Sequence, residues 1–436
     1  MSSDSVEALI REFRERGWES KPFDRAFDLA LNQPEAIQRL AFGMLEQVPK
    51  GATFLDALLS FLPMADWPEV VRQALTALDH VERNETAESV IEYASLQSLS
   101  ALHPHLRTIF HVAPNVSAYF GELAWRESGK TDFVPLRALI QDESQAPQDR
   151  LRAWRCLLET LDIENLQFAV SQAPPIDLNF RLREPGLPQT LNVDYFLRLV
   201  GFECHEGGFR QLYKSPALHL VFPPEYFLDR SWRSWFRRNH PTWNQKAEHE
   251  MVSGPMSFGG QGEGECKVCG KSLHRLLNLD PVPPDFGVSN RTALDLCTCL
   301  SCLGWEQEQL FYYHDDQGRP ENIGYEGPTV VPQIPAEPLI ATQVRLADLG
   351  SRWHWQDWGY SNHRENLHRL GSFPCSIQGA DYLCCPQCHH TMQFLLQLDS
   401  ELPMMDSKEW LWGSGGICYC FWCDNCKVSG FLWQCT

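Results

Sequence analysis

The sequence predicts a multidomain protein of the α+β class, in which an all-α, HEAT-like stack of helices is followed by a duplicated β-rich domain. Two observations predict this class. Apolar residues recur with helical spacing over residues 1–165, and a cysteine-centred segment occurs twice after residue 265. A chain of 436 residues is long enough for two or three domains. We therefore expect domains at residues 1–165, 175–330 and 331–436.

Helical periodicity is clear from the N-terminus onward. Val6, Leu9 and Phe13 follow the i, i+3, i+7 spacing that places side chains on one face of a helix. Similar apolar stripes continue as far as a last helix expected at 151–158. Short helices joined by short loops favour a HEAT-like stack. No sequence repeat of roughly 30 to 45 residues is evident, so a compact helical domain without repeats remains an alternative.

The pattern changes beyond residue 175, where short strands and irregular loops are expected. Residues 209–213 and 218–222 alternate between apolar and polar side chains in the manner of strands. Pro, Gly and Trp then become frequent. The Pro-rich residues 331–338 are expected to link the two β-rich domains.

An internal repeat is the strongest signal in the chain. The pattern C-x2-C-x6-L-L-x-L-D occurs at residues 266–280 and again at 385–399. Each copy is completed by a second Cys-x-x-Cys pair, at 299–302 and at 423–426. A two-residue spacer lets both thiolates of a pair reach one metal ion, and two pairs complete a tetrahedron.

The spacing therefore predicts two zinc-ribbon-like sites with four cysteine ligands each. One zinc ion is expected on Cys266, Cys269, Cys299 and Cys302, and the other on Cys385, Cys388, Cys423 and Cys426. A site closed by four cysteines has no open coordination position, so the two zinc ions are expected to be structural. The sequence leaves open whether one of Cys297, Cys384, Cys418 and Cys420 replaces an assigned ligand.

Other interpretations of the cysteines fit less well. A redox dithiol needs only one Cys-x-x-Cys pair, whereas here the pairs are themselves paired. Four thiolates can also hold an iron–sulfur cluster, and buried cysteines can lack any metal. His389 and His390, which directly follow Cys388, are expected to be exposed or to lie behind the ligands.

The net charge and the cysteine pattern limit the cellular compartment and the class of partner that we expect. The formal net charge is -19, which repels nucleic acid and anionic membranes and favours a basic protein partner. The N-terminus has no signal-peptide pattern, and no stretch is apolar enough to span a membrane. Paired cysteines that bind metal fit a reducing compartment, so we expect a cytoplasmic protein.

The second copy of the repeat resembles the YwqG-like family and its eukaryotic relatives, the programmed-cell-death-protein-two and twenty-S-rRNA-accumulation proteins. The resemblance covers roughly residues 250–436, and its motifs lie at 370–374, Gln378, 395–399, 412–416 and 421–423. The sequence departs from the family at Ser372, where a second glycine is usual. The first copy keeps Phe258-Gly259-Gly260 but not the following proline. The resemblance implies a duplicated β-rich domain that binds protein segments.

The predicted function is protein binding, because no catalytic motif is found. The chain contains no G-x-S-x-G elbow, no H-E-x-x-H pair and no phosphate loop, so no catalytic residue is predicted. The resemblance implies either a bacterial immunity protein that neutralises a toxin or a chaperone-like binder of a basic, ribosomal-type client. The alternatives are an enzyme, such as a hydrolase, whose site cannot be recognised from the sequence, and an RNA-associated factor using the arginines at 230–238. The expected partner-binding residues are Trp353, Trp355, Trp358, Gly371, Pro374 and Gln378.

Overall fold

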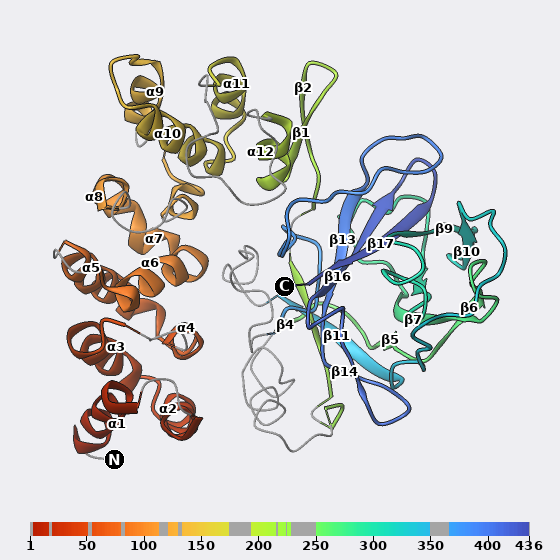
Figure 1. The fold of residues 1–436 in the computed structure, drawn as a ribbon, viewed down its shortest axis with the longest axis horizontal. Coiled ribbons are helices and arrows are strands. Elements are labelled where there is room, and N and C mark those ends of the chain that lie inside the picture. Colours follow the sequence, from red (N-terminus) through yellow and green to blue (C-terminus); the bar gives the residue numbers. More distant parts are fainter. Residues whose placement is uncertain are drawn as a thin grey trace. The chain divides into compact units, whose positions relative to one another are not determined.

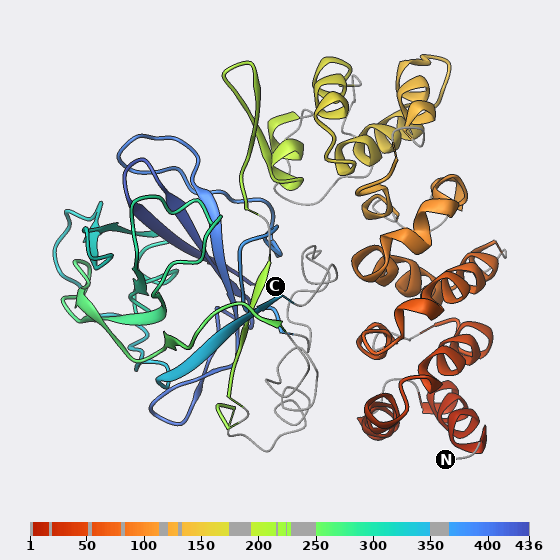
Figure 2. The ribbon, with the colours of Figure 1, turned by 180° about the vertical axis from the view of Figure 1, so that it is seen from behind.

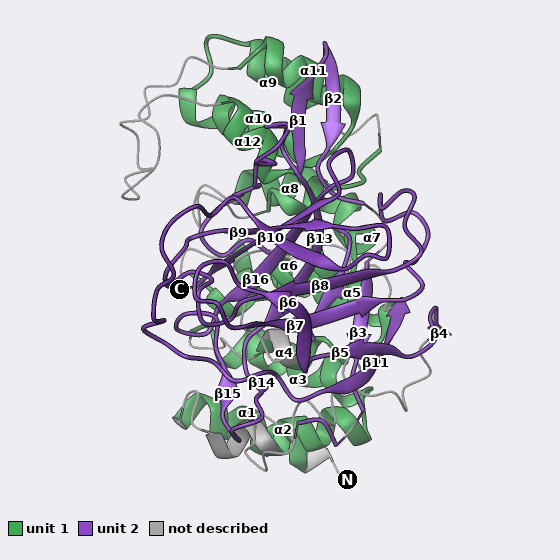
Figure 3. Ribbon diagram, turned by 90° about the vertical axis from the view of Figure 1, so that its right-hand side faces the viewer, with its two compact units in different colours: residues 1–200 green, residues 201–436 purple. Residues whose placement is uncertain are grey.

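The computed structural model describes residues 3–16, 20–50, 55–79, 83–112, 121–129, 133–173, 193–214, 217–223, 225–227, 250–348 and 366–435. The chain divides into two compact units, residues 1–200 and 201–436, which Figure 3 colours separately. The first unit is helical and the second is rich in strands, which confirms the predicted α+β class. None of the described helices is long and apolar enough to cross a membrane.

The first unit is built from helices (Figure 1), and apolar side chains from these helices form its buried core. In α1 the predicted stripe of Val6, Leu9 and Phe13 is buried. Helix α3 lies against both α1 and α5, so the helices follow one another in packed layers. The helices are α1 (Ser3–Arg16), α2 (Ser20–Asn32), α3 (Ala36–Gln47), α4 (Leu55–Leu59), α5 (Trp67–Leu78), α6 (Glu85–Gln97), α7 (Leu99–Leu102), α8 (Leu106–Val112), α9 (Val134–Gln141), α10 (Pro147–Glu159), α11 (Ile163–Ser171) and α12 (Val193–Leu199).

The second unit is organised around one large sheet. Among the described residues, thirteen strands pair in the order β10-β9-β17-β16-β13-β12-β3-β11-β5-β7-β6, with β4 on β11 and β8 on β7. The strands of the sheet are β3 (Leu218–Val221), β4 (Glu250–Met251), β5 (Met256–Phe258), β6 (Gln261–Glu265), β7 (Ser272–Leu279), β8 (Leu294–Thr298), β9 (Leu310–His314), β10 (Pro320–Ile323), β11 (Thr342–Asp348), β12 (Arg369–Leu370), β13 (Gln393–Asp399), β16 (Ile417–Cys423) and β17 (Val428–Gln434). Two hairpins, β1 (Phe202–His205) with β2 (Gly208–Gln211) and β14 (Leu402–Pro403) with β15 (Glu409–Trp410), lie outside it.

The two copies of the repeat occupy equivalent positions in this sheet. The Leu-Leu-x-Leu-Asp strand, β7 or β13, pairs with β8 or β16, which leads into the second cysteine pair. It also pairs with a short strand before a tight turn, β5 or β12. Gly259 and Gly371 begin these turns, and each donates its backbone N–H to the carbonyl oxygen of the first leucine, Leu276 or Leu395. The repeat in the sequence is therefore a repeat of strand positions.

Figure 2 shows the strand-rich unit from behind. Its two copies of the repeat exchange strands. Strand β3 precedes the first copy but pairs with β12 of the second, whereas β11 precedes the second copy and pairs with β5 of the first. The two exchanged strands also pair with each other, with Leu220 opposite Leu346. At the other end, β9 of the first copy pairs with β17 of the second. Residues 175–330 and 331–436, which were expected to form separate domains, therefore contribute strands to one sheet.

The Pro-rich residues 331–338, expected to form a linker, pack against the first cysteine pairs. The backbone N–H of Gln333 donates to the carboxylate of Glu306, and that of Ala336 donates to the hydroxyl of Ser301. Just before them, Val330 donates to the carbonyl oxygen of Val268. The segment is therefore part of the unit and lies against the turns that carry the first cluster.

Candidate metal centres

The structure gathers the eight predicted ligands into two groups of four. Cys266, Cys269, Cys299 and Cys302 form the first cluster, and Cys385, Cys388, Cys423 and Cys426 form the second. Within each cluster the Sγ atoms all lie within 4.8 Å of one another. Tetrahedral zinc with Zn–S bonds near ~2.3 Å requires S···S separations of about 3.8 Å. The Sγ atoms of Cys269 and Cys299 are 3.7 Å apart, and those of Cys388 and Cys423 are 3.6 Å apart, so both groups fit one metal ion each.

The first Cys-x-x-Cys pair of each copy sits in the same tight turn. Cys266 donates its N–H to the carbonyl oxygen of Lys271, and Cys385 donates in the same way to His390. The carbonyl oxygen of each of these cysteines accepts from the residue after the second cysteine, Gly270 or His389. Both of those residues have positive φ, at 71° and 61°. His389 therefore serves the turn through its backbone, and its exposed side chain lies outside the cluster.

The two clusters differ in exposure. All four thiols of the first cluster are buried, whereas Cys388 and Cys426 in the second are only partly buried. Polar groups also support the first cluster. Cys299 donates its N–H to the Tyr312 hydroxyl over 3.1 Å, and Leu300 donates to Nδ1 of His274 over 3.2 Å. Water and reagents therefore reach the second cluster more readily.

The electrostatics of each cluster favour a bound cation. Hydrogen bonds from Cys299 and Cys302 lower the pKa of Cys266, and the same contact with Cys266 raises the pKa of Cys299. Burial raises the pKa of Cys388, but hydrogen bonds from the His390 backbone N–H and from neighbouring thiols outweigh it and lower the pKa to about 7. Without a metal ion, therefore, the thiols of one group do not all ionise together, because a thiolate on one cysteine raises the pKa of its neighbours. A divalent cation would let all four thiols ionise, since metal ligation requires thiolates.

The other cysteines lie apart from both clusters. Cys297, Cys418 and Cys420 are buried, and Cys384 is exposed. None of them belongs to either group among the residues that the structure describes. Burial raises the pKa of Cys297, Cys418 and Cys420, which keeps these thiols protonated. None of these four cysteines therefore needs to replace an assigned ligand in either cluster.

The predicted partner-binding residues are divided between described and masked segments. Trp353, Trp355 and Trp358, like the arginines at 230–238, lie outside the described residues. Gly371 and Pro374 are buried, whereas Gln378 is exposed. These three lie on the loop between β12 and the second cluster, residues 371–384. Ser372 on this loop adopts φ of 59°.

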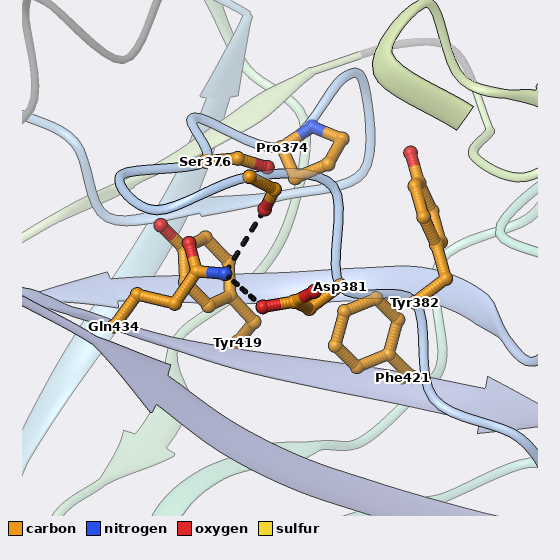
Figure 4. Close-up of a pocket in the computed structure, with 8 residues that line it drawn as sticks. Pro374, Ser376, Asp381, Tyr382, Tyr419, Phe421 and Gln434 are labelled. Atoms are coloured by element: carbon orange, nitrogen blue, oxygen red, sulfur yellow. Dashed lines mark hydrogen bonds between the residues drawn. The ribbon is translucent and has the colours of Figure 1, made fainter. Parts of the chain in front are cut away.

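Buried polar side chains of the sheet hold this loop in one conformation. Gln397 of β13 accepts a hydrogen bond from the Cys375 N–H, and the Tyr419 hydroxyl of β16 donates to the Cys375 carbonyl oxygen. Gln434 of β17 makes four hydrogen bonds. Its Oε1 accepts from the N–H groups of Ile377 and Gln378. Its Nε2 donates to the carbonyl oxygen of Gly379 and to Oδ2 of Asp381, and Figure 4 shows these two bonds.

A small pocket opens beside this hydrogen-bond network. Its lining includes Pro374, Asp381, Tyr382, Phe421 and Gln434 (Figure 4). Neither Asp381 nor Gln434 was predicted from the sequence. Gln434 carried a usable signal, since it is a polar residue that directly follows the apolar Phe431, Leu432 and Trp433, and a buried polar side chain needs hydrogen-bond partners. Asp381 carried none, because an isolated aspartate in a loop is ordinary.

The fold and the two clusters define a two-unit α+β protein with a pair of candidate four-cysteine metal centres in its strand-exchanged sheet. One curated relative is the uncharacterized protein YpfL of Salmonella typhimurium strain LT2, 24% identical over 250 residues. The match covers 54% of this chain and 49% of that protein, so the chain spans about half the length of the relative. No family model matches the chain, and no solved structure matches it either.

Proposed function

We propose that this protein is a non-enzymatic protein-binding protein whose β-rich unit is stabilised by two structural zinc ions. The observation that carries the proposal is the loop at 371–384, whose backbone is fixed by Gln397, Tyr419 and Gln434 while the Gln378 side chain remains exposed. A surface loop held in advance loses little conformational entropy when a partner binds. Zinc at the second cluster, which follows the loop directly, would anchor its far end.

The choice of zinc follows from the ligands. Four thiolates in a closed tetrahedron suit zinc, which needs no open position in a structural site. The same closure argues against metal-assisted catalysis, because no coordination position is left for water or substrate.

The partner that we propose is a basic protein. The net charge of -19 favours association with cations, and the resemblance to YwqG-like proteins supports a role in holding protein segments. Within this class, a toxin neutralised by an immunity protein and a ribosomal-type client of a chaperone share the same chemistry. A HEAT-like helical unit would provide a second surface for such a partner.

The test is capture of a partner from the native host by the zinc-loaded full chain, compared with Gln378→Ala. We expect a protein of high pI, captured more slowly as salt rises, and weaker capture by the variant at unchanged thermal stability. Glu326→Gln, which alters an exposed carboxylate elsewhere in the β-rich unit, serves as the control. Recovery of an acidic protein or of RNA would overturn the proposal.

A further inference from the structure

The two clusters have the same four ligands but differ in the packing of the residues between those ligands. In the first cluster Val268, Leu300 and Ser301 are buried, as are all four thiols. The backbone N–H of Val330 donates to the carbonyl oxygen of Val268, and that of Ala336 donates to the Ser301 hydroxyl. Residues 330–336 therefore lie against both cysteine pairs of the first cluster and limit the access of solvent to it.

The corresponding residues of the second cluster are exposed. Gln387 and Asn425 occupy the second position between the cysteines of their pairs, and both side chains are exposed. Cys388 and Cys426 are only partly buried, whereas Cys423 is 7% exposed. A small reagent dissolved in water can therefore approach Cys388, although the same reagent is kept from the first cluster.

The second cluster also contains a second thiol close enough to complete a disulfide with Cys388. The Sγ atoms of Cys388 and Cys423 are 3.6 Å apart, and disulfide formation must bring them to about 2 Å. Cys269 and Cys299 of the first cluster are similarly close, at 3.7 Å. Exposure, and not the distance between sulfurs, therefore distinguishes the two clusters. Zinc would hold all of these sulfurs as thiolates, the nucleophilic form of cysteine.

We propose that the second cluster is a site of oxidation by hydroperoxides, at which one zinc ion is released. The thiolate of Cys388 attacks the terminal oxygen of the peroxide and becomes a sulfenic acid, while the O–O bond breaks and the leaving hydroxide or alkoxide takes up a proton. The thiolate of Cys423 then attacks this sulfur, forms the disulfide and displaces hydroxide, which takes up a second proton to give water. The two thiolates lose two electrons in total, and the peroxide accepts them.

Oxidation at this site would change the anchoring of the 371–384 loop. The disulfide keeps one link between the two cysteine turns, but Cys385 and Cys426 are too few to hold the ion. Cys385 directly follows the loop, and beside it Met392 donates its N–H to the carbonyl oxygen of Leu383. Release of the ion is therefore expected to loosen the far end of the loop and weaken partner binding. This regulation rests on the proposed function.

Timed treatment of the zinc-loaded full chain with hydrogen peroxide tests the proposal without any partner. Zinc is measured by elemental analysis after desalting, and disulfides are mapped by mass spectrometry after the remaining thiols are alkylated. We expect one ion to be lost about tenfold faster than the other, because oxidation follows exposure, with a Cys388–Cys423 disulfide and a reduced first cluster. Loss of both ions at one rate, loss of neither, or a different disulfide would overturn the proposal. Fewer than two ions before peroxide is added would contradict the proposed function itself.

Cys388→His removes the sulfur that the peroxide attacks but keeps a ligand, since three cysteines and one histidine form a common structural zinc site. We expect this variant to retain both ions over the period in which the parent loses one. Cys204→Ser is the control, because Cys204 is exposed but lies outside both clusters, and it should lose one ion as the parent does. Unchanged loss in Cys388→His would overturn the role of Cys388. If that variant binds only one ion, the disulfide found in the parent decides the question.

Discussion

The indole Nε1 of Trp433 donates a hydrogen bond to the backbone carbonyl oxygen of Leu303 over 2.9 Å. Leu303 follows Cys302 of the first cluster, whereas Trp433 lies on β17, the strand that leaves the second cluster. A side chain added at Gly304 would meet the Trp433 ring at 2.0 Å, so the turn needs glycine for this approach. A side chain of the second copy therefore packs on the cysteine turn of the first copy and forms a hydrogen bond with it.

Trp433→Phe is expected to destabilise the β-rich unit by about 1 kcal/mol, because the buried carbonyl of Leu303 loses a donor. Urea unfolding of the zinc-loaded protein measures the change. Trp305→Phe is the matched control. Trp305 packs on Trp433 with ring centroids 5.4 Å apart, but its Nε1 has no hydrogen-bond partner among the described residues. Equal destabilisation by the two variants would assign the effect to ring packing and contradict the role given to the hydrogen bond.

Gln434→Ala is expected to loosen the 371–384 loop without unfolding the sheet. The N–H groups of Ile377 and Gln378 lose their acceptor, and a hydrogen bond worth about 1.4 kcal/mol corresponds to roughly tenfold faster amide exchange. Hydrogen exchange with mass spectrometry would detect this in peptides covering 375–382. Gln378→Ala, whose side chain is exposed, should leave exchange unchanged. Unaltered exchange in Gln434→Ala would show that the loop is fixed by other contacts.

The second cluster is expected to lose its metal first. Cys388 and Cys426 are partly exposed, whereas all four thiols of the first cluster are buried. A brief treatment with a zinc chelator and a thiol-alkylating reagent should label Cys385, Cys388, Cys423 and Cys426 before the other group. Mass spectrometry of the labelled peptides measures the order in which the cysteines are alkylated. Labelling of Cys266 or Cys302 at the same rate would show that exposure does not govern metal release.

His314 is expected to make the β-rich unit less stable in mild acid. Burial lowers the pKa of His314 to about 4. The neutral ring bonds the Gly318 carbonyl oxygen through Nδ1 and the Ser429 hydroxyl through Nε2. The unfolded chain takes up a proton below about pH 6.5 that the folded chain excludes, so stability falls as the pH decreases from there toward 4, by up to roughly 3 kcal/mol.

The difference in stability between the parent and His314→Gln isolates this contribution from acid release of zinc, which affects both proteins. Urea unfolding at pH 7.0 and 5.5 should give a steeper loss for the parent. Parallel losses would show that His314 does not titrate as its burial requires.

Features that depend on the spacing of nearby residues could be predicted from the sequence. The stripe of Val6, Leu9 and Phe13 marked a helix, and the Cys-x-x-Cys pairs marked groups that the fold brings together. The exchange of β3 and β11 could not be predicted, because both strands are short and the strands they pair with lie more than 80 residues away in the sequence. The position of residues 331–338 was likewise hidden, because prolines that pack on a turn and prolines that link domains look alike in a sequence.

The most direct test of the account is metal content by elemental analysis and native mass spectrometry of the full chain. The account predicts two zinc ions per chain, and about one in Cys423→Ser with a lowered melting temperature, because structural zinc binding is coupled to folding. Cys420→Ser, on the same strand but outside the clusters, should keep two. One ion or none in the parent, iron in place of zinc, or two ions retained by Cys423→Ser would contradict it.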